Sequence, residues 1–190
     1  MDKEAIKAVR AVYTLLSAGF ARPLSSVFFN DFLLLAPLLR QLIPDADGIV
    51  SAVIDYGRDT AEEDMSRHYS SLFLSGAFGK IISPCESVYL SGEALMMQEQ
   101  RDEVLFEFVK HKIGLTSSFS EPEDHIAAEL AFAGHLADNN AERKKFIEAH
   151  PLKWIKLLED EFEVLEGGIY KNLATLSRLF MEFDRDILLV

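Results

Sequence analysis

The residue types best suited to chemistry gather in the segment Glu121-Pro122-Glu123-Asp124-His125, where three carboxylates precede one imidazole. Because carboxylates bind arginine in a bidentate geometry, one interpretation is an acidic pocket for a cationic peptide. The plain alternative is a well-capped helix start, since acidic side chains stabilise the positive end of a helix. A helix dipole disfavours a charged His125 and the nearby carboxylates favour it, so the sequence leaves the charge of this imidazole open.

A metal centre is the next chemistry to consider. His125 and Glu129 are four residues apart and would share one face of a helix. The sequence contains no His-Glu-x-x-His, no Glu-x-x-His and no pair of cysteines, which are the ligand patterns of zinc and di-iron proteins. We therefore expect no metal and no other cofactor. A helical metal- or cofactor-binding enzyme that uses His125 and Glu129 is kept as the alternative.

Nucleophilic and nucleotide chemistry have little support. Cys85 is the only cysteine, and Glu86 beside it opposes the lowered pKa that a reactive thiolate needs, so we expect an inert, packed thiol. Gly76 and Gly79 are not followed by the Gly-Lys-Ser/Thr of a phosphate-binding loop. Neither pattern indicates catalysis.

Composition narrows the class of protein. The chain has 190 residues, 49% hydrophobic and 26% charged, which is ordinary for one globular domain over residues 1–190. Nineteen Lys and Arg against thirty-one Asp and Glu give a net charge of −12, which repels nucleic acid. The amino-terminal residues lack the pattern of a secretory signal, which predicts a cytoplasmic protein. The longest apolar run, Phe32–Leu39, is far below the roughly 20 residues needed to span a membrane.

Helices must position these residues, because apolar side chains recur at steps of three and four with no sustained alternation of two. The periodicity predicts an all-α fold, an irregular multi-helix bundle. In the first part of the chain, we expect helices over about 3–20 and 25–43, the second with a kink at Pro37, and two more helices that begin at Thr60 and at Ser83. In the second part, we expect helices over about 93–113, 120–138 and 139–148. A long helix is expected from 151 to Gly167-Gly168, followed by a last helix. No repeat or linker divides the chain, so one domain is expected, with exchange of elements between protomers as the alternative.

Several side chains have expected structural roles. Asp2 is available to cap the first helix, and three capping boxes mark later starts at Thr60–Glu63, Ser83–Glu86 and Ser120–Glu123. The basic run Arg143-Lys144-Lys145 is expected on a solvated helix face. Core packing is the assignment for Tyr69, Phe73, Trp154 and Phe162, whereas Tyr89 is open to lining a groove for an apolar peptide segment.

Three segments, taken in order, resemble one protein family. They are Tyr69-Ser70-Ser71-Leu72-Phe73, then Ser83-Pro84-Cys85-Glu86-Ser87-Val88-Tyr89-Leu90, then Glu121-Pro122-Glu123-Asp124-His125-Ile126 with Glu129-Leu130. The ordered set is similar to the TorD/DmsD/NarJ-type redox enzyme maturation chaperones and covers about residues 60–140. The resemblance implies a cytoplasmic, all-helical, TorD-like protein that is not an enzyme.

The resemblance also implies a partner and a site. Such a chaperone binds the twin-arginine signal peptide of a molybdoenzyme catalytic subunit, of the dimethyl sulfoxide, trimethylamine N-oxide or nitrate reductase type, delays its export and assists cofactor insertion. The family's Glu-Pro-x-Asp-His motif falls on Glu121–His125, and its Pro-x-x-Ser motif falls on Pro84–Ser87. The expected peptide-binding residues are Pro84, Glu86, Ser87, Tyr89, Glu121, Pro122, Asp124, His125 and Glu129.

A specific hypothesis follows for the way the peptide binds. We expect Asp124, with Glu121 or Glu123, to meet the paired arginines, while Tyr89 contacts the apolar part of the leader. Some members of the family exchange elements near the Asp-His segment, so the expected state is a monomer or a domain-swapped dimer with a hinge near 114–125. A further alternative is an assembly factor that grips the folded catalytic subunit, which binding of an isolated leader would separate from the first.

Overall fold

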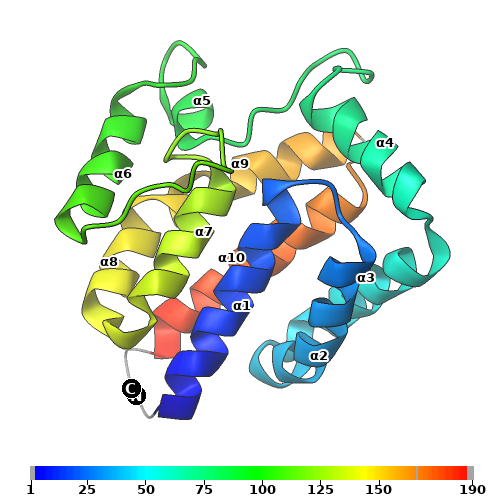
Figure 1. Ribbon diagram of the computed structural model, residues 1–190, viewed down its shortest axis with the longest axis horizontal. Coiled ribbons are helices and arrows are strands. Elements are labelled where there is room, and N and C mark those ends of the chain that lie inside the picture. The colour runs from blue at the N-terminus through cyan, green and yellow to red at the C-terminus, as the bar shows by residue number, and fades with distance from the viewer. Residues whose placement is uncertain (1–2, 166, 188–190) are drawn as a thin grey trace.

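The computed structural model describes residues 3–165 and 167–187, and in this part of the chain the fold is all-α, as predicted (Figure 1). The helices are α1 (Lys3–Ala21), α2 (Ser26–Leu42), η1 (Pro44–Ala46), α3 (Asp47–Asp59), α4 (Glu62–Phe73), α5 (Glu86–Leu90), α6 (Glu99–Lys110), α7 (Ile126–His135), η2 (Leu136–Asp138), α8 (Asn140–Ala149), α9 (Pro151–Val164) and α10 (Ile169–Ile187). The cap expected at Asp2 lies outside the described residues. Among the described helices, none combines the length and the apolar character that crossing a bilayer requires.

Helix α1 runs through the middle of the molecule, with α7 on one side and α2 on the other (Figure 1). Its contact with α7 is close because Gly134 has no side chain: a Cβ there would lie 3.0 Å from the Cβ of Tyr13. Large side chains such as Phe20, Phe32 and Trp154 are fully buried around this pair. Each contributes about 1.5–3 kcal/mol by leaving water, so apolar burial holds the helices in place.

A buried charged network joins helices from both ends of the chain. Arg143 of α8 donates from Nε and Nη2 to the two carboxylate oxygens of Asp184 in α10, at 2.7 and 2.9 Å. Its Nη1 donates to the carbonyls of Leu136 and Ala137, and the hydroxyl of Tyr13 in α1 donates to Asp184 at 2.8 Å. The prediction of a solvated face is therefore wrong for Arg143, which is fully buried because carboxylate and carbonyl acceptors surround its guanidinium.

Two of the expected capping boxes do not form, because their glutamates bond to distant partners. Helix α5 begins at Glu86, whose carboxylate contacts His150 instead of reaching back to Ser83. Helix α7 begins at Ile126, and Glu123 of the expected box pairs with Arg101 of α6. Both helix starts are therefore displaced by a few residues toward the carboxyl terminus. A tertiary partner has replaced the local backbone amide in each case.

The third box and one expected helix also differ from the structure. Thr60 ends α3, a helix that the sequence pattern did not predict, and it does not cap α4. Glu62, at the start of α4, accepts a hydrogen bond from the backbone N–H of Ser26 at 2.6 Å and so satisfies the start of α2. The helix expected over 93–113 is shorter, because residues 91–98 form a loop before α6.

Candidate functional site

The two motif segments, Pro84–Ser87 and Glu121–His125, lie side by side although 37 residues separate Ser87 from Asp124. The backbone N–H of Ile126 donates to the carbonyl of Pro84, and that of Glu86 donates to the carbonyl of Asp124, both at 2.8 Å. Cys85 and His125 thereby form an isolated antiparallel bridge. The structure thus brings together in one junction the segments that the sequence could only name separately.

Asp124 fixes this junction from within. The side chain is fully buried, and its Oδ2 accepts hydrogen bonds from the backbone N–H of Ser87, at 2.8 Å, and from the Ser87 hydroxyl. Burial raises the pKa of Asp124, and the two bonds from Ser87 oppose that rise. Its Oδ2 is engaged at the junction and its Oδ1 makes no hydrogen bond among the described residues, so the contact with an arginine expected at Asp124 stays a prediction, which the burial of this side chain disfavours.

His125 caps α7 in place of the expected serine. Its Nδ1 accepts a hydrogen bond from the backbone N–H of Ala127 at 3.1 Å, and the ring of Phe119 packs edge-on against it at 5.6 Å. Burial lowers the pKa of His125 to about 3, so the imidazole is neutral near pH 7. The charge that the sequence left open is therefore zero, and one ring nitrogen is already engaged as a cap.

A group of acidic residues is buried directly behind the junction. Glu129 of α7 is fully buried and accepts a hydrogen bond from the indole N–H of Trp154 at 3.1 Å. Glu86 lies 2.9 Å from the Nδ1 of His150. Burial and the neighbouring Glu86 raise the pKa of Glu129 well above its ordinary value, which favours the protonated form of Glu129. Among the described residues, the group whose ligand atoms lie close enough together to hold a metal ion does not include His125 or Glu129.

Tyr89, at the end of α5, joins the site to α9. Its ring stacks on that of Trp154, with centroids 5.2 Å apart and an interplanar angle of 21°. Its hydroxyl donates to Glu161, which also pairs with Lys80 at 2.5 Å. Burial raises the pKa of Tyr89, as does the bond to Glu161. The stack covers one face of the ring, so Tyr89 has a structural contact in addition to any role toward a peptide.

The remaining motif residues differ in how accessible they are. Glu121 is exposed and Pro122 is half-buried, whereas Cys85 is buried with a raised pKa, in agreement with the predicted inert thiol. Glu123 is held by Arg101 of α6, with 2.6 Å between Nε and the carboxylate. Arg101 therefore already binds Glu123, a carboxylate that the sequence analysis expected to meet the arginines of a partner.

The functional neighbourhood includes residues that the sequence reasoning missed. Arg101, His150 and Glu161 contact motif residues, and Lys80 pairs with Glu161, but all four lie outside the three segments. Each comes from a different part of the chain and carries no spacing pattern. Only the three-dimensional fold could have assigned them to the site.

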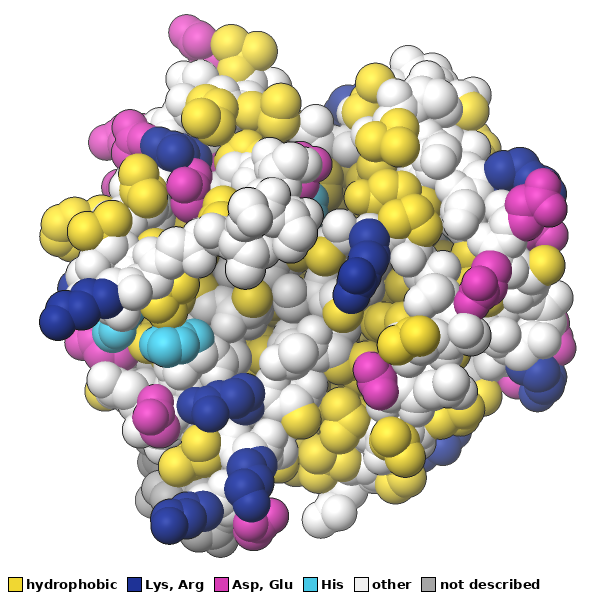
Figure 2. All heavy atoms as spheres, viewed as in Figure 1, with side chains coloured by type: hydrophobic (Ala, Val, Ile, Leu, Met, Phe, Trp, Pro, Cys, Tyr) yellow, Lys and Arg dark blue, Asp and Glu magenta, His cyan; other side chains and the backbone are white. Residues whose placement is uncertain are grey.

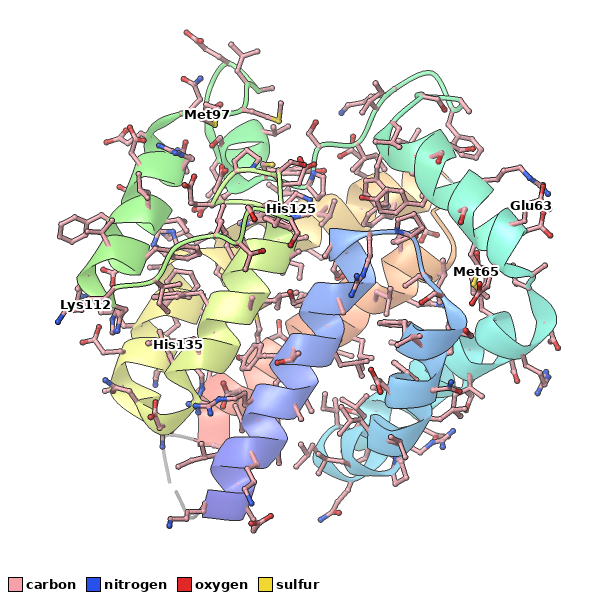
Figure 3. All side chains as sticks on the ribbon, in the orientation of Figure 1. Glu63, Met65, Met97, Lys112, His125 and His135 are labelled. Atoms are coloured by element: carbon pink, nitrogen blue, oxygen red, sulfur yellow. The ribbon has the colours of Figure 1, made fainter. Side chains whose placement is uncertain are left out.

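Two loops with exposed apolar side chains flank the junction. Figure 2 shows hydrophobic side chains on both sides of a notch, and Figure 3 places Met97 on one of these loops and His125 below it. The exposed residues are Leu74, Phe78 and Ile81 around the α4–α5 connection and Leu95, Met96 and Met97 between α5 and α6. Exposed apolar patches of this kind on a folded protein indicate an interaction surface.

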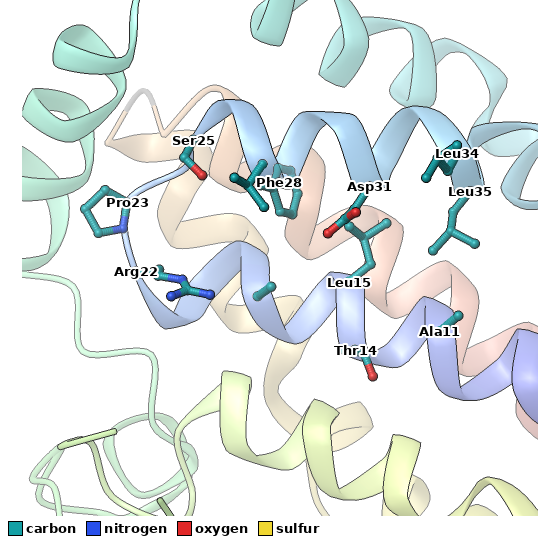
Figure 4. Close-up of a pocket in the computed structure, with 12 residues that line it drawn as sticks. Ala11, Thr14, Leu15, Arg22, Pro23, Ser25, Phe28, Asp31, Leu34 and Leu35 are labelled. Carbon is teal, nitrogen blue, oxygen red and sulfur yellow. The ribbon is translucent and has the colours of Figure 1, made fainter. Parts of the chain in front are cut away.

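Two hollows lie near the junction. A pocket of about 280 Å³ is lined by Phe119 and by Ala127, Ala128 and Ala131 of α7, next to the motif itself. A groove of about 590 Å³ separates α1 from α2, with Asp31 in its wall (Figure 4). Ser17 of α1 donates to the carbonyl of Ala127 at 2.7 Å, so the end of α1 that bounds both hollows is attached to the motif helix.

The comparisons with known proteins define first the fold and then the family. The fold is shared with a crystal structure from Archaeoglobus fulgidus, described as a candidate redox enzyme maturation protein, which matches with a TM-score of 0.58 over 91% of this chain and 93% of that one, at 20% sequence identity. The chain belongs to the nitrate reductase delta subunit family, whose model matches residues 35–160. The family predicted from the motif segments is confirmed.

Individual relatives extend over most of the chain. The chaperone protein TorD of Shewanella pealeana is 27% identical over 193 residues, which cover 92% of this chain and 87% of the relative. TorD of Vibrio atlanticus is 26% identical and covers 98% of each chain. TorD of Shewanella oneidensis is 30% identical over 143 residues, 70% of this chain and 65% of that one.

Proposed function

We propose that this protein is a cytoplasmic maturation chaperone that binds the twin-arginine leader of a molybdoenzyme catalytic subunit, assists cofactor insertion and delays export. The observation that carries the proposal is the junction itself, where Asp124 joins the two motif segments beneath an acidic and apolar surface. The relatives named chaperone protein TorD support the same role. On this view the protein is a binding partner and not an enzyme.

We place the arginines of the leader at the rim of the site and not at its centre. Asp124 is buried and bonded, whereas Glu121 is exposed and Glu123 is reached by displacing Arg101. Because the guanidinium of Arg101 already binds Glu123, the Glu123 carboxylate is oriented to bind an arginine of the leader in the same way. The net charge of −12 steers a cationic leader toward the protein.

The apolar part of the leader is assigned to the pocket beside Phe119. Phe119 and, from the motif helix, Ala127 and Ala128 line this pocket, so an apolar side chain bound there would lie close to the motif segment. The groove between α1 and α2 is the competing location. Apolar pockets with a charged rim are the usual recognition mode for amphipathic peptides.

Titration calorimetry of the full chain with a twin-arginine leader peptide tests the proposal. We expect saturable binding that weakens with added salt and weakens again when lysines replace the two arginines. Glu121→Gln is expected to reduce affinity by about tenfold without changing stability, because the side chain is exposed and an interface ion pair is worth on the order of 1.5 kcal/mol.

A matched pair of variants locates the apolar contact. Ala131→Gln narrows the pocket at an exposed helix position, and Leu34→Gln replaces an apolar side chain of the groove between α1 and α2 by a polar one of similar size. The pocket assignment predicts that only Ala131→Gln weakens the leader. Loss of binding in Leu34→Gln alone would move the apolar part to the groove. The absence of binding to any leader would instead favour a factor that grips the folded catalytic subunit.

A further inference from the structure

A second cluster of side chains with chemical potential lies apart from the motif junction. Glu107 and His111 are four residues apart at the end of α6, and Glu142 lies in the first turn of α8. One ligand atom from each, two carboxylate oxygens and an imidazole nitrogen, lie within 4.8 Å of one another. In the described part of the chain, no other group of three His, Cys, Asp or Glu side chains brings its ligand atoms this close together.

The imidazole of His111 is oriented into this cluster, and its Nε2 makes no hydrogen bond among the described residues. This nitrogen is shielded from solvent and lies 3.7 Å from the nearer carboxylate oxygen of Glu142. The ring of Phe132 packs edge-on against it at 5.5 Å and holds its orientation. A shielded nitrogen without a hydrogen bond costs free energy, which a bond to a metal would recover.

A cation already sits between the two carboxylates. The ammonium of Lys110 lies 3.0 Å from Glu107 and 2.7 Å from Glu142. Its side chain is 37% exposed and ends a flexible four-carbon stem, so the ammonium can swing into solvent and leave both carboxylates in place. The two glutamates are therefore preorganised around a positive charge.

We propose that Glu107, His111 and Glu142 form a binding site for a divalent transition-metal ion, with Zn²⁺ as the representative, and that Lys110 occupies the same space when the metal is absent. One nitrogen and two oxygen ligands suit zinc, whereas Mg²⁺ and Ca²⁺ prefer all-oxygen sites. Three protein ligands leave a fourth position for water. The ion would link the end of α6 to the start of α8. Because His111 directly follows α6, the ion would also fix the start of the connection that leads to the motif segment 121–125.

The test uses the full chain, stripped with a chelator, and zinc chloride as the only titrant. We expect one saturable site by calorimetry and, with Co²⁺, visible absorption from a site of nitrogen and oxygen ligands. His111→Ala and Glu142→Gln are expected to weaken binding by at least about tenfold, the size of effect found even for indirect partners of metal ligands.

Two further variants make the outcome decisive. Lys110→Met keeps all three ligands and removes the competing charge, so it is expected to tighten zinc binding severalfold. His135→Ala is the matched control, because its ring stacks on the same Phe132 but lies outside the cluster. Absence of stoichiometric binding, binding that survives His111→Ala, or binding lost in His135→Ala would each overturn the proposal. Leader binding is measured in parallel, and its result bears only on the function proposed above.

Discussion

The buried contact between Asp124 and Ser87 predicts a specific loss of stability. Asp124→Ala removes the acceptor for the Ser87 backbone N–H and hydroxyl, and both groups stay in a fully buried residue. Each unsatisfied donor costs about 1–3 kcal/mol, and relief of the buried carboxylate offsets part of this. The expected decrease in the free energy of unfolding is about 3 kcal/mol. Asp124→Asn keeps one acceptor oxygen in place and is expected to cost about 1 kcal/mol.

Urea unfolding followed by fluorescence gives a direct measurement. Trp154 is the only tryptophan, and it lies buried against Tyr89 close to the junction, so its emission reports on this region. A decrease of about 3 kcal/mol corresponds to a fall of roughly 6–12 °C in the melting temperature of a chain of this size. The exposed Glu121→Gln variant is the control and is expected to stay within about 0.5 kcal/mol of the wild type.

The test compares the free energies of unfolding of the three variants. We expect Asp124→Ala to be the least stable, Asp124→Asn to be intermediate, and Glu121→Gln to match the wild type. If Asp124→Ala unfolds at the same urea concentration as Glu121→Gln, then the junction does not depend on this carboxylate. In that case a loss of leader binding in Asp124→Ala would support a direct contact between Asp124 and the peptide, in place of the structural role assigned to it.

Two other buried groups give predictions for stability. The folded protein holds a proton on Glu129 that the unfolded chain releases above about pH 4.5, so this residue lowers stability as pH rises from there toward its raised folded pKa. Glu129→Gln removes that loss, and its stability relative to the wild type is expected to increase with pH, by up to about 1.4 kcal/mol per unit, in urea titrations from pH 5 to 8; a constant difference would contradict the raised pKa. Arg143→Met leaves the Asp184 carboxylate buried without its main partner and is expected to cost about 3–5 kcal/mol in the same assay. Adding Asp184→Asn is expected to recover part of that cost, and simple additivity of the two changes would argue against the pairing.

Much of the fold was predictable because helical periodicity reports burial directly. The helices near both ends of the chain follow the expected positions, since their apolar faces pack on a core that does not depend on detailed polar contacts. The helix starts were less predictable. Glu86 and Glu123 match the local capping pattern, but His150 and Arg101 offer stronger partners from elsewhere in the fold.

Prediction of the site had the same limit. The motif segments identified the family, but residue types and their spacing along the chain do not show that Ser87 bonds to Asp124. The fold reversed two expectations: Asp124 is buried beneath the surface, and the guanidinium of Arg143 is buried in an ion pair with Asp184. Charge alone predicts a solvated residue, and only the surrounding acceptors show otherwise.

The hydrogen bond between Tyr13 and Asp184 spans 171 residues, which constrains the order of folding. Contacts between such distant residues form late, because closing a long loop lowers the entropy of the chain before the contact contributes any stabilising free energy. During synthesis α1 can pair with α7 as soon as both have emerged, but Tyr13 and Arg143 lack their shared carboxylate until residue 184 leaves the ribosome. Completion of the core is thus coupled to the synthesis of Asp184, and a nascent chain that stops before this residue lacks the contact that joins α1 to α10.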